Sequence, residues 1–445
     1  DASRAFESEV FDAIGKETAV ADTRSEKMDD LRLTIAKLLT GKRDPTTIAE
    51  VDNGECTTSI RAELLRAWAH AARDPAERLC DWLTEGAPAG LSKDFAALDT
   101  LFPRVAPGDK GDPESLFTDH DGFVNYKGAD GNKEVGKHLD DFVNKKYLKR
   151  CRSLEEVRRF LGAEPVVNKL GAIEILKTSP TTGEVRKKLR LILDNAQSGV
   201  TAVADRSHGS TLPRATHAVK GILGLMEPTE WHAASDEEVW LLIADISNAF
   251  WLVPLHPEER RFFVARHGDY WYVFLGTAQG SRGAPLTWAA LAALLARCVQ
   301  GLFAVGNEDE ARLQVYVDDP LLAVRGRYWR RRRLVVRFCV AFLLLGFRLA
   351  FNKAQYFQAV VWIGVGLRVF TRKVEATVPG EKVKNILEIV DDMLGQNVVA
   401  VKKVRTLAGK SMNIASLIVV LRPCLAPFWA ALTYDATKAP NVCVG

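Results

Sequence analysis

The residues best suited to carry out chemistry are two adjacent aspartates in an otherwise apolar stretch. Residues 314–320 read Gln-Val-Tyr-Val-Asp-Asp-Pro, and apolar residues flank Asp318 and Asp319 on both sides. The pattern predicts a β-hairpin with the two acids at its turn. Two neighbouring carboxylates repel each other and are costly to desolvate, so this arrangement indicates a compensating cation. The alternative for the pair alone is a solvated Asp-Asp turn, because Asp is a favoured turn residue.

A third acid, Asp245, ends a second apolar strand pattern over residues 239–245. Phosphoryl transfer with paired Mg²⁺ ions needs carboxylates from separate elements, which hold the ions roughly 3.5–4 Å apart. Neighbouring strands lie about 4.8 Å apart, so carboxylates at the ends of adjacent strands meet that requirement. We therefore expect Asp245 and Asp318 to be the main ligands of two Mg²⁺ ions, with Mn²⁺ as an alternative. Asp319 would point to the other face of its strand and be a more peripheral ligand.

The order of these and later motifs resembles the reverse transcriptases. The resemblance rests on Asp245-Ile-Ser-Asn-Ala-Phe250, Gln279-Gly280-Ser-Arg-Gly-Ala-Pro285, Tyr316-Val-Asp-Asp319, Leu345-Gly-Phe347 with Lys353, Trp362-Ile-Gly364 and Leu407-Ala-Gly409-Lys410. The amino-acid sequences of the first two motifs are most similar to those of retrotransposons of the DIRS type or their long-terminal-repeat relatives. The chain departs from the family by one inserted residue before Asn413.

The resemblance implies an α+β fold, a right-hand polymerase with fingers, a palm of antiparallel sheet and helices, and a helical thumb. The implied boundaries are 151–225 and 253–285 for the fingers, 226–252 and 286–378 for the palm, and 379–445 for the thumb. A mainly helical N-terminal accessory region and linker would occupy residues 1–150. Helical spacing of apolar residues at 61–72, 154–161, 380–394 and 401–408 agrees with helices in these regions.

Further site residues are implied by the same motifs. Arg190 and Asp194 resemble the fingers strand whose basic residues meet the incoming triphosphate, but Ala196 stands where the family often has an Arg. Trp362 and Gly364 would belong to the hairpin that contacts the primer. Gly409 and Lys410 would lie on the thumb helix beside the template-primer duplex.

Some residues have a physical role that does not depend on the family. An aromatic ring at Phe250, close behind Asp245, could exclude a ribose 2′-hydroxyl by steric contact and select deoxynucleotides. Gln279 and Gly280 lie in a glycine-rich segment that could approach a nucleotide closely before the helix pattern at 286–303. The alternatives are an ordinary core Phe and a common surface loop.

Lys353 is a candidate general acid for the departing pyrophosphate, because phosphoryl transfer requires charge neutralisation on the leaving group. The alternative is an ordinary surface lysine. The run from Arg325 to Arg333 contains six arginines in nine residues and could bind nucleic acid. Such runs are usually solvated faces, so we leave this one out of the expected site.

Composition limits the alternatives only weakly. The 445 residues include 60 Lys+Arg and 56 Asp+Glu, so any nucleic-acid binding would depend on local patches rather than on the net charge of +4. The seven cysteines show no C-x-x-C pair, which predicts free thiols in a reducing compartment, the cytoplasm or nucleus. We find no signal peptide, and the apolar stretch 334–351 contains Arg337 and Arg348, which favours a buried helix over a membrane span.

The sequence thus predicts a nucleotidyltransferase, an RNA-directed DNA polymerase of a retroelement that extends a primer with dNTPs on an RNA or DNA template. Expected partners are the template-primer duplex, dNTPs and other retroelement proteins or a larger assembly, but no membrane. A first alternative is a domesticated, catalytically idle nucleic-acid-binding or scaffold subunit. A second is an RNA-dependent RNA polymerase, which Phe250 disfavours because such enzymes usually have a polar residue there.

Overall fold

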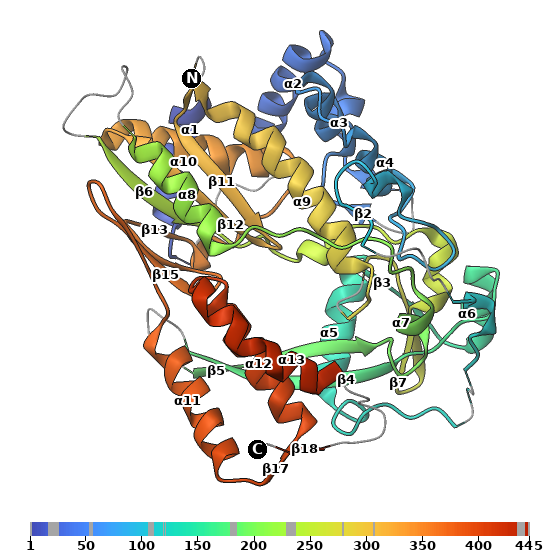
Figure 1. The fold of residues 1–445 in the computed structure, drawn as a ribbon. Coiled ribbons are helices and arrows are strands. Elements are labelled where there is room, and N and C mark those ends of the chain that lie inside the picture. The colour runs from blue at the N-terminus through green and yellow to red at the C-terminus, as the bar shows by residue number, and fades with distance from the viewer. Residues whose placement is uncertain are drawn as a thin grey trace.

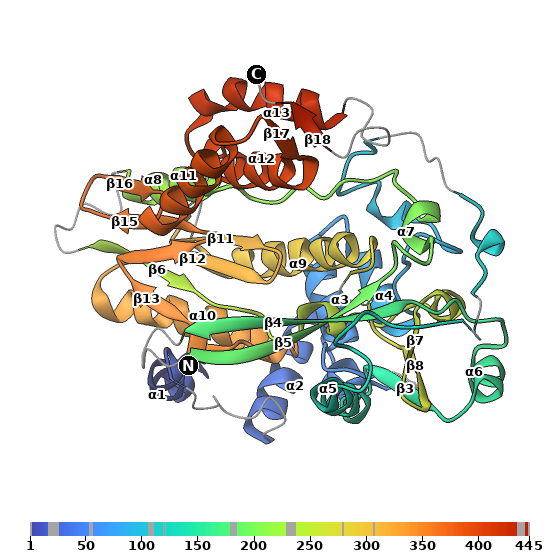
Figure 2. The same cartoon turned by 90° about the horizontal axis from the view of Figure 1, so that it is seen from below.

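The structure, a computed structural model, describes residues 2–16, 26–52, 57–105, 111–118, 120, 122–178, 185–227, 237–277, 280–305, 308–433 and 441–443. Helices and antiparallel sheets are mixed along the chain. Figure 1 shows a central sheet with its helices, a long hairpin with a small sheet at one end, and a group of C-terminal helices. In Figure 2 the hairpin and the C-terminal helices lie on opposite sides of the central sheet.

The central sheet has four antiparallel strands in the order β11 (Ala311–Tyr316), β12 (Asp319–Gly326), β6 (Glu238–Ile243) and β13 (Gln355–Phe357). The alternation of strand side chains divides its apolar residues between two cores. Leu242 and Leu322 pack with helices α9 (Ala284–Gln300) and α10 (Tyr328–Leu344), whereas Leu241 and Leu321 pack with α8 (Ala215–Met226). The sheet is therefore covered on both faces, which fixes its register.

A second, three-stranded sheet follows the central one and leads to the C-terminal helices. Its strands are β14 (Ala359–Trp362), β15 (Val365–Val369) and β16 (Val374–Thr377). The chain continues through α11 (Gly380–Leu394), β17 (Val398–Ala400), α12 (Val401–Ala415) and α13 (Arg422–Thr433), and β18 (Asn441–Cys443) pairs with β17. Helices α11, α12 and α13 form a small core of their own around Val404, Leu407 and Leu432.

The long hairpin consists of β4 (Lys169–Thr178) and β5 (Val185–Asp194), which pair only with each other. Beside its base lies a sheet of β3 (Leu148–Cys151), β8 (Tyr270–Phe274) and β7 (Val264–His267). The helices around it are α5 (Lys133–Asn144), α6 (Leu154–Leu161) and α7 (Val200–Val203). Elsewhere, after α9, strand β9 (Ala304–Val305) pairs with β10 (Glu308–Asp309). Helices α6 and α11 have the limits that the sequence pattern indicated.

The N-terminal region is mainly helical, with α1 (Ala2–Ala13), α2 (Glu26–Thr40), α3 (Ala62–Ala71), α4 (Asp81–Thr84) and the two-residue strands β1 (Val51–Asp52) and β2 (Thr57–Thr58). Its apolar side chains belong to the same core as α9 and α10. The buried Arg32 donates to the backbone carbonyls of Leu343 and Leu344 at 2.8 and 2.9 Å. A side chain at Gly346 would collide with the backbone of Ser59, so the two segments touch directly.

The expectation of a separate accessory region and linker over 1–150 does not describe this packing. Most of the buried apolar residues described between Phe6 and Phe102 share one core with the central sheet, whereas Ala89, Leu91, Ala129, Val135 and Leu139 share a second core with the base of the β4–β5 hairpin. The sequence could not reveal this, because the apolar faces of these helices indicate burial without naming the partner.

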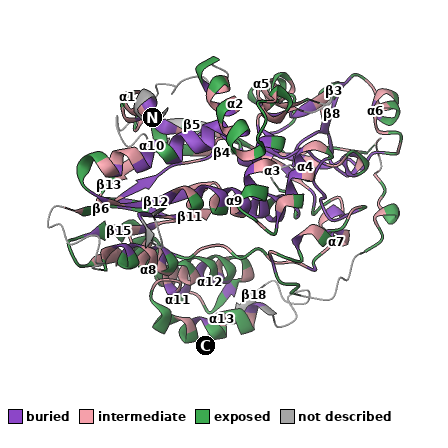
Figure 3. Cartoon of the chain, turned by 90° about the horizontal axis from the view of Figure 1, so that it is seen from above, coloured by how far each residue is buried: buried purple, intermediate pink, exposed green. Residues whose placement is uncertain are grey.

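Buried side chains concentrate around the central sheet and α9, whereas α11–α13 are mostly exposed or half-buried (Figure 3). The segment Ala284–Phe303 is long and apolar enough to cross a membrane, but most of its apolar side chains are used in the core. The stretch 334–351 is likewise buried, in α10 and the segment after it. Cys80, Cys151, Cys298, Cys339 and Cys424 are free thiols.

Candidate active site

Two aspartates are brought together at one end of the central sheet. Asp245 follows β6 and Asp318 precedes β12, and these strands are hydrogen-bonded neighbours in which Leu321 lies opposite Ile243. The pairing continues past the strand ends, because the backbone N–H of Ile246 donates to the carbonyl of Asp318 at 2.8 Å. The predicted hairpin is confirmed, with one difference: its turn is Val317-Asp318, and Asp319 already pairs with Tyr316 as the first residue of β12.

The turn that carries Asp318 is held by two tryptophans. Val317 has a φ of +55°, which is unusual for a β-branched residue and strains the backbone. The indole N–H of Trp288, on α9, donates to the Val317 carbonyl at 2.7 Å, and that of Trp362 donates to the Asp319 carbonyl at 3.0 Å. Both tryptophans are buried, so the backbone around Asp318 is fixed from both sides.

The charges around Asp318 act on its ionisation. Burial and the nearby negative charge of Asp245 raise the pKa of Asp318 above its usual value, and the positive charges of Lys353 and Arg190 oppose this shift. Lys353, in the 3-10 helix η8 (Phe351–Lys353), forms an ion pair with Asp245, with 2.6 Å between Nζ and Oδ2. Charged residues from four separate segments of the chain therefore interact at this end of the sheet.

The donor set fits Mg²⁺ bound jointly by protein and substrate. Among the described residues, no group of three or more His, Cys, Asp or Glu side chains is arranged to enclose a metal ion. Mg²⁺ is usually bound by one or two carboxylates together with waters and substrate phosphates rather than by an all-protein cage. Asp245 and Asp318 supply two carboxylates of this kind. Asp319 is half-buried at the start of β12, and its backbone carbonyl is engaged by Trp362.

Phe250 follows Asp245 in the 3-10 helix η5 (Ala249–Leu252). Its half-buried ring is tilted against that of Trp288, with 6.4 Å between the ring centroids. Since Trp288 also binds the Val317 carbonyl, one side chain connects the Phe250 ring to the aspartate turn. The Thr277 hydroxyl donates to the Phe250 carbonyl at 2.6 Å and fixes its backbone.

Arg190 is exposed on β5, and its positive charge acts to lower the pKa of Asp318. Gly280 lies against the end of the same strand, where a Cβ atom would be 2.5 Å from the Leu193 carbonyl oxygen. Only glycine permits this approach at a φ of +107°. Gln279 lies outside the described residues.

Asp194, at the end of β5, accepts hydrogen bonds from a group that the motif did not indicate. The Tyr126 hydroxyl donates to it at 2.5 Å, and the backbone N–H groups of Ala196 and Gln197 donate at 2.9 and 3.2 Å. Although burial opposes the shift, these donors together lower the pKa of Asp194. Tyr126 thus supplies a side-chain donor to Asp194 from a segment far from β5 in the sequence.

The four residues expected to contact primer or template lie in two places. Trp362 is buried, with 1% of its surface exposed, so a contact from this hairpin would come from the Ile363-Gly364 turn rather than from the indole. Gly409 and Lys410 lie on α12 and line a cavity of about 540 Å³ between α12 and α11. Lys382 bonds Asn413 at 3.1 Å across this cavity, and Lys410 bonds Asn385.

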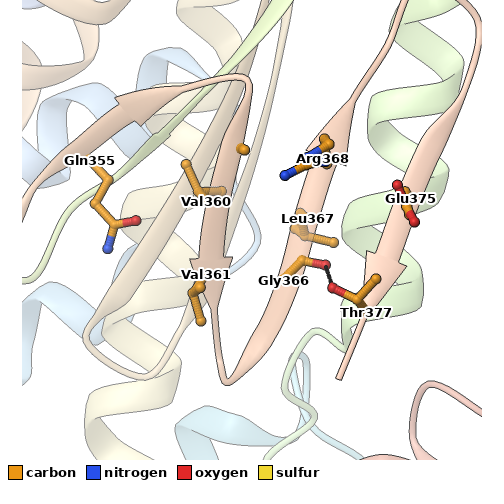
Figure 4. A pocket seen from close by; sticks show the side chains of 9 residues that line it. Gln355, Val360, Val361, Gly366, Leu367, Arg368, Glu375 and Thr377 are labelled. Carbon is orange, nitrogen blue, oxygen red and sulfur yellow. Dashed lines mark hydrogen bonds between the residues drawn. The ribbon is translucent and has the colours of Figure 1, made fainter. Parts of the chain in front are cut away.

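A second hollow, of about 370 Å³, lies on the β14–β16 sheet and does not involve the aspartates. Figure 4 shows Val361, Gly366 and Thr377 on the strands and Gln355 beyond the edge of the sheet. These strand residues lie on the face opposite Val360, Trp362 and Leu367, which pack with α8. This hollow is therefore separate from the site around Asp318.

The arginine run is used in structural ion pairs. The pairs are Arg325–Glu237 at 3.2 Å, Arg331–Glu238 at 2.9 Å, Arg332–Glu7 at 2.6 Å and Arg330–Glu310. Arg332 also lies over the Phe11 ring of α1, 3.7 Å from its centroid. The run joins α10 to the N-terminal helix and the central sheet.

Sequence reasoning missed Trp288 and Tyr126. Trp288 follows the motif 279–285 in an apolar helical pattern, where a tryptophan reads as ordinary core. Tyr126 lies in an irregular segment far from any motif. Nothing in the spacing of either residue signals its contact with the site.

Comparison with known families agrees with the geometry. Residues 181–367 match the family model described as reverse transcriptase (RNA-dependent DNA polymerase). The matched segment is less than half of the chain. It runs from the start of the β5 region to β15 and contains Arg190, Asp245, Phe250, Asp318 and Lys353.

Among solved structures, the chain is similar to the foamy viral protease-reverse transcriptase dRH with double-stranded DNA, at 14% identity and a TM-score of 0.44, over 92% of this chain and 56% of that one. It is also similar to foamy viral protease-reverse transcriptase with an RNA/DNA hybrid, at 14% identity and a TM-score of 0.44, over 84% of this chain and 42% of that one. A third similarity, to the same protein with double-stranded DNA, has 14% identity and a TM-score of 0.43, over 84% and 64%. The chain thus spans less than two thirds of the length of each. No curated protein matches it.

Proposed function

We propose that this chain is an RNA-directed DNA polymerase of a retroelement, of the DIRS type or related to long-terminal-repeat elements, which extends a primer with dNTPs. The observation that carries the proposal is the pair Asp245 and Asp318 on neighbouring strands, with Lys353 and Arg190 close enough to act on Asp318. The family match over residues 181–367 supports the same reaction class.

The proposed domains keep the expected names. The central sheet with α8, α9 and α10 would be the palm, the β4–β5 hairpin with its neighbouring sheet the fingers, and α11–α13 the thumb. Helix α8 falls almost entirely in the segment 151–225 expected for the fingers, and we assign it to the palm because it packs on the central sheet. The N-terminal helices would form part of the palm scaffold, because they share its core.

Asp245 and Asp318 would hold Mg²⁺ ions, with Asp319 in a supporting position. When bound, these ions neutralise the phosphate charge and align the attacking and leaving oxygens. Mn²⁺, which also favours oxygen ligands, could replace Mg²⁺.

Each remaining residue has one proposed task. Arg190 would bind the triphosphate, and Lys353 would leave Asp245 to protonate the departing pyrophosphate. Phe250, beside Trp288, would close the space that a ribose 2′-hydroxyl needs. Gln279 and Gly280 would position the incoming nucleotide.

The proposed partners are a template-primer duplex and dNTPs. Exposed Gly409 and Lys410 beside the α11–α12 cavity would contact the duplex. Other retroelement proteins or a larger assembly would be further partners, in a reducing compartment of the cytoplasm or nucleus.

Primer extension tests this proposal. Purified protein is given a primer on an RNA and on a DNA template with Mg²⁺ and either dNTPs or rNTPs. We expect synthesis from dNTPs, which Asp318→Asn abolishes. The matched control is Asp269→Asn, since Asp269 is exposed in another two-residue hairpin turn, between His267 and Tyr270. A folded protein that binds duplex but synthesises nothing would reject the polymerase in favour of the idle scaffold.

A further inference from the structure

One segment of the N-terminal region is built onto the base of the β4–β5 hairpin. The backbone N–H of Tyr126 donates to the Leu170 carbonyl at 3.2 Å, and the Leu170 N–H donates to the Asn125 side chain at 2.8 Å. Asn125 is itself fixed by Asp130 at 2.7 Å and by the Arg266 carbonyl at 2.8 Å. This segment is therefore held in place by polar contacts on both sides of Tyr126.

The Tyr126 side chain is anchored at its hydroxyl and open on its ring. The hydroxyl donates to Asp194 at 2.5 Å, while 43% of the residue remains exposed. A Cβ atom at Gly171 would lie 3.7 Å from the ring, so the ring lies over this glycine. The ammonium of Lys169 lies 5.7 Å from the ring centroid. An exposed aromatic ring with a neighbouring cation is the arrangement that binds unpaired nucleobases.

The ring lies on the same face of the hairpin as Arg190. Residues Arg190, Ile192 and Asp194 alternate along β5, and their partners on β4 are Ile173, Gly171 and Lys169. This face is open, with Ile173 49% exposed, whereas Leu170 and Leu193 on the other face are buried. Arg190, whose charge acts on Asp318, and Asp194, which accepts from the Tyr126 hydroxyl, therefore lie on one open face.

The distance along the strand separates the ring from the site of chemistry. Asp194 lies four residues after Arg190 on β5, which corresponds to roughly 13 Å along the strand. An incoming nucleotide with its triphosphate at Arg190 lies at the near end of this face. The Tyr126 ring, anchored through its hydroxyl to Asp194, lies at the other end.

We propose that Tyr126 is a stacking site for the first unpaired base of the template, with Lys169 attracting the adjoining phosphate. This inference rests on the proposed function. The ligand class is single-stranded nucleic acid, RNA or DNA, since stacking uses the face of the base and not the sugar.

The experiment measures binding of the full chain to two substrates of the same duplex sequence. One is blunt, and the other has a 5′ template overhang whose first unpaired base is 2-aminopurine, whose fluorescence falls on stacking. We expect Tyr126→Ala to weaken binding of the overhang substrate about 10-fold, to leave the blunt duplex unchanged and to abolish the quenching. Tyr126→Phe keeps the ring and should keep the quenching.

Tyr270→Ala is the matched control, because Tyr270 is 41% exposed and also carries a cation, Arg150, 4.9 Å from its ring centroid. It should leave both substrates unaffected. Equal losses on blunt and overhanging substrates for Tyr126→Ala would show a purely structural residue, and unchanged overhang binding would reject the site outright. Primer extension by the wild-type protein is followed in parallel. If the wild-type protein extends primers but Tyr126→Ala does not alter overhang binding or quenching, only this inference is rejected. If the overhang base is quenched but no primer is extended, only the proposed polymerase function is rejected.

Discussion

The two hairpins that face each other across the site are built in opposite ways. The β11–β12 hairpin is part of a four-stranded sheet, both faces of the sheet are buried, and two indole N–H groups bind its turn. The β4–β5 hairpin pairs only with itself, one face is open, and its packing is concentrated at the base. The hairpin with the carboxylates is packed on both faces, whereas the hairpin with Arg190 is packed mainly at its base.

This difference separates two tasks. Carboxylates that hold metal ions must be positioned before the substrate arrives, because misplacement by about 1 Å can cost 10²-fold in rate. A side chain that captures a triphosphate gains from an element that can close on it. We therefore expect changes near the aspartate turn to affect kcat, and changes on the open hairpin to affect nucleotide binding.

Among changes that leave the aspartates in place, Trp288→Phe should give the largest effect. The substitution removes the N–H that binds the Val317 carbonyl, while a ring remains in the core. We expect kcat to fall about 100-fold, because the strained turn would no longer hold Asp318 in place. Single-turnover dNTP incorporation measures this, and Trp329→Phe, which alters an exposed indole on α10, is the control. An unchanged kcat in a folded variant would mean that the rest of the sheet suffices to fix the turn.

Arg190→Ala should change nucleotide binding more than turnover. Loss of the guanidinium is expected to raise the KM for dNTP about 10-fold, since charge-assisted bonds to phosphate contribute about 1.5–3 kcal/mol. Lys187→Ala on the same strand is the control, because Lys187 is exposed, lies on the opposite face and pairs with Glu174 at 3.3 Å. If Arg190→Ala lowered kcat and left KM unchanged, the open hairpin would be part of the preorganised site, and the comparison would fail.

Sequence reasoning was most informative where motif and local geometry coincide. Alternation and adjacent acids predicted the β11–β12 hairpin, and the end of an apolar strand predicted Asp245 beside it. Helical periodicity predicted α6 and α11 because a single face of each helix is apolar. The arginine run could not be interpreted from sequence, because its acidic partners Glu7, Glu237, Glu238 and Glu310 are distant in the chain.

The N-terminal region shows the limit of such reasoning. Arg32, on α2, is fully buried against the end of α10, more than 300 residues away. No local pattern specifies which carbonyls a guanidinium will bind. For the same reason Tyr126, in a segment predicted to be a linker, could not be connected to Asp194.

Asp318→Asn should stabilise the protein while it removes activity. The pKa of Asp318 is raised on folding by burial and by Asp245, so its ionised form costs stability at any pH above that raised pKa. We expect the Asn variant to gain about 0.5–1 kcal/mol in urea unfolding at pH 7 without metal. The gain should disappear below the unfolded pKa of about 3.9, where the carboxyl is protonated in both states. A variant less stable than wild type at pH 7 would show that the folded protein stabilises the ionised carboxylate of Asp318 instead of destabilising it.

Tyr126→Phe should have the smallest effect and tests how firmly the open hairpin is fixed at its base. Removing the hydroxyl deletes one donor to Asp194 but leaves the backbone N–H groups of Ala196 and Gln197 in place. Since the folded pKa of Asp194 is lowered, the carboxylate stabilises the fold fully above its unfolded pKa of about 3.9 and loses this contribution as the pH falls through the folded pKa. We expect a decrease in Tm of roughly 1–2 °C at pH 7 that shrinks in acid, with Tyr270→Phe as the control. A decrease several times larger at pH 7 would mean that the base of this hairpin depends strongly on its contact with the N-terminal segment, so that it too is firmly fixed.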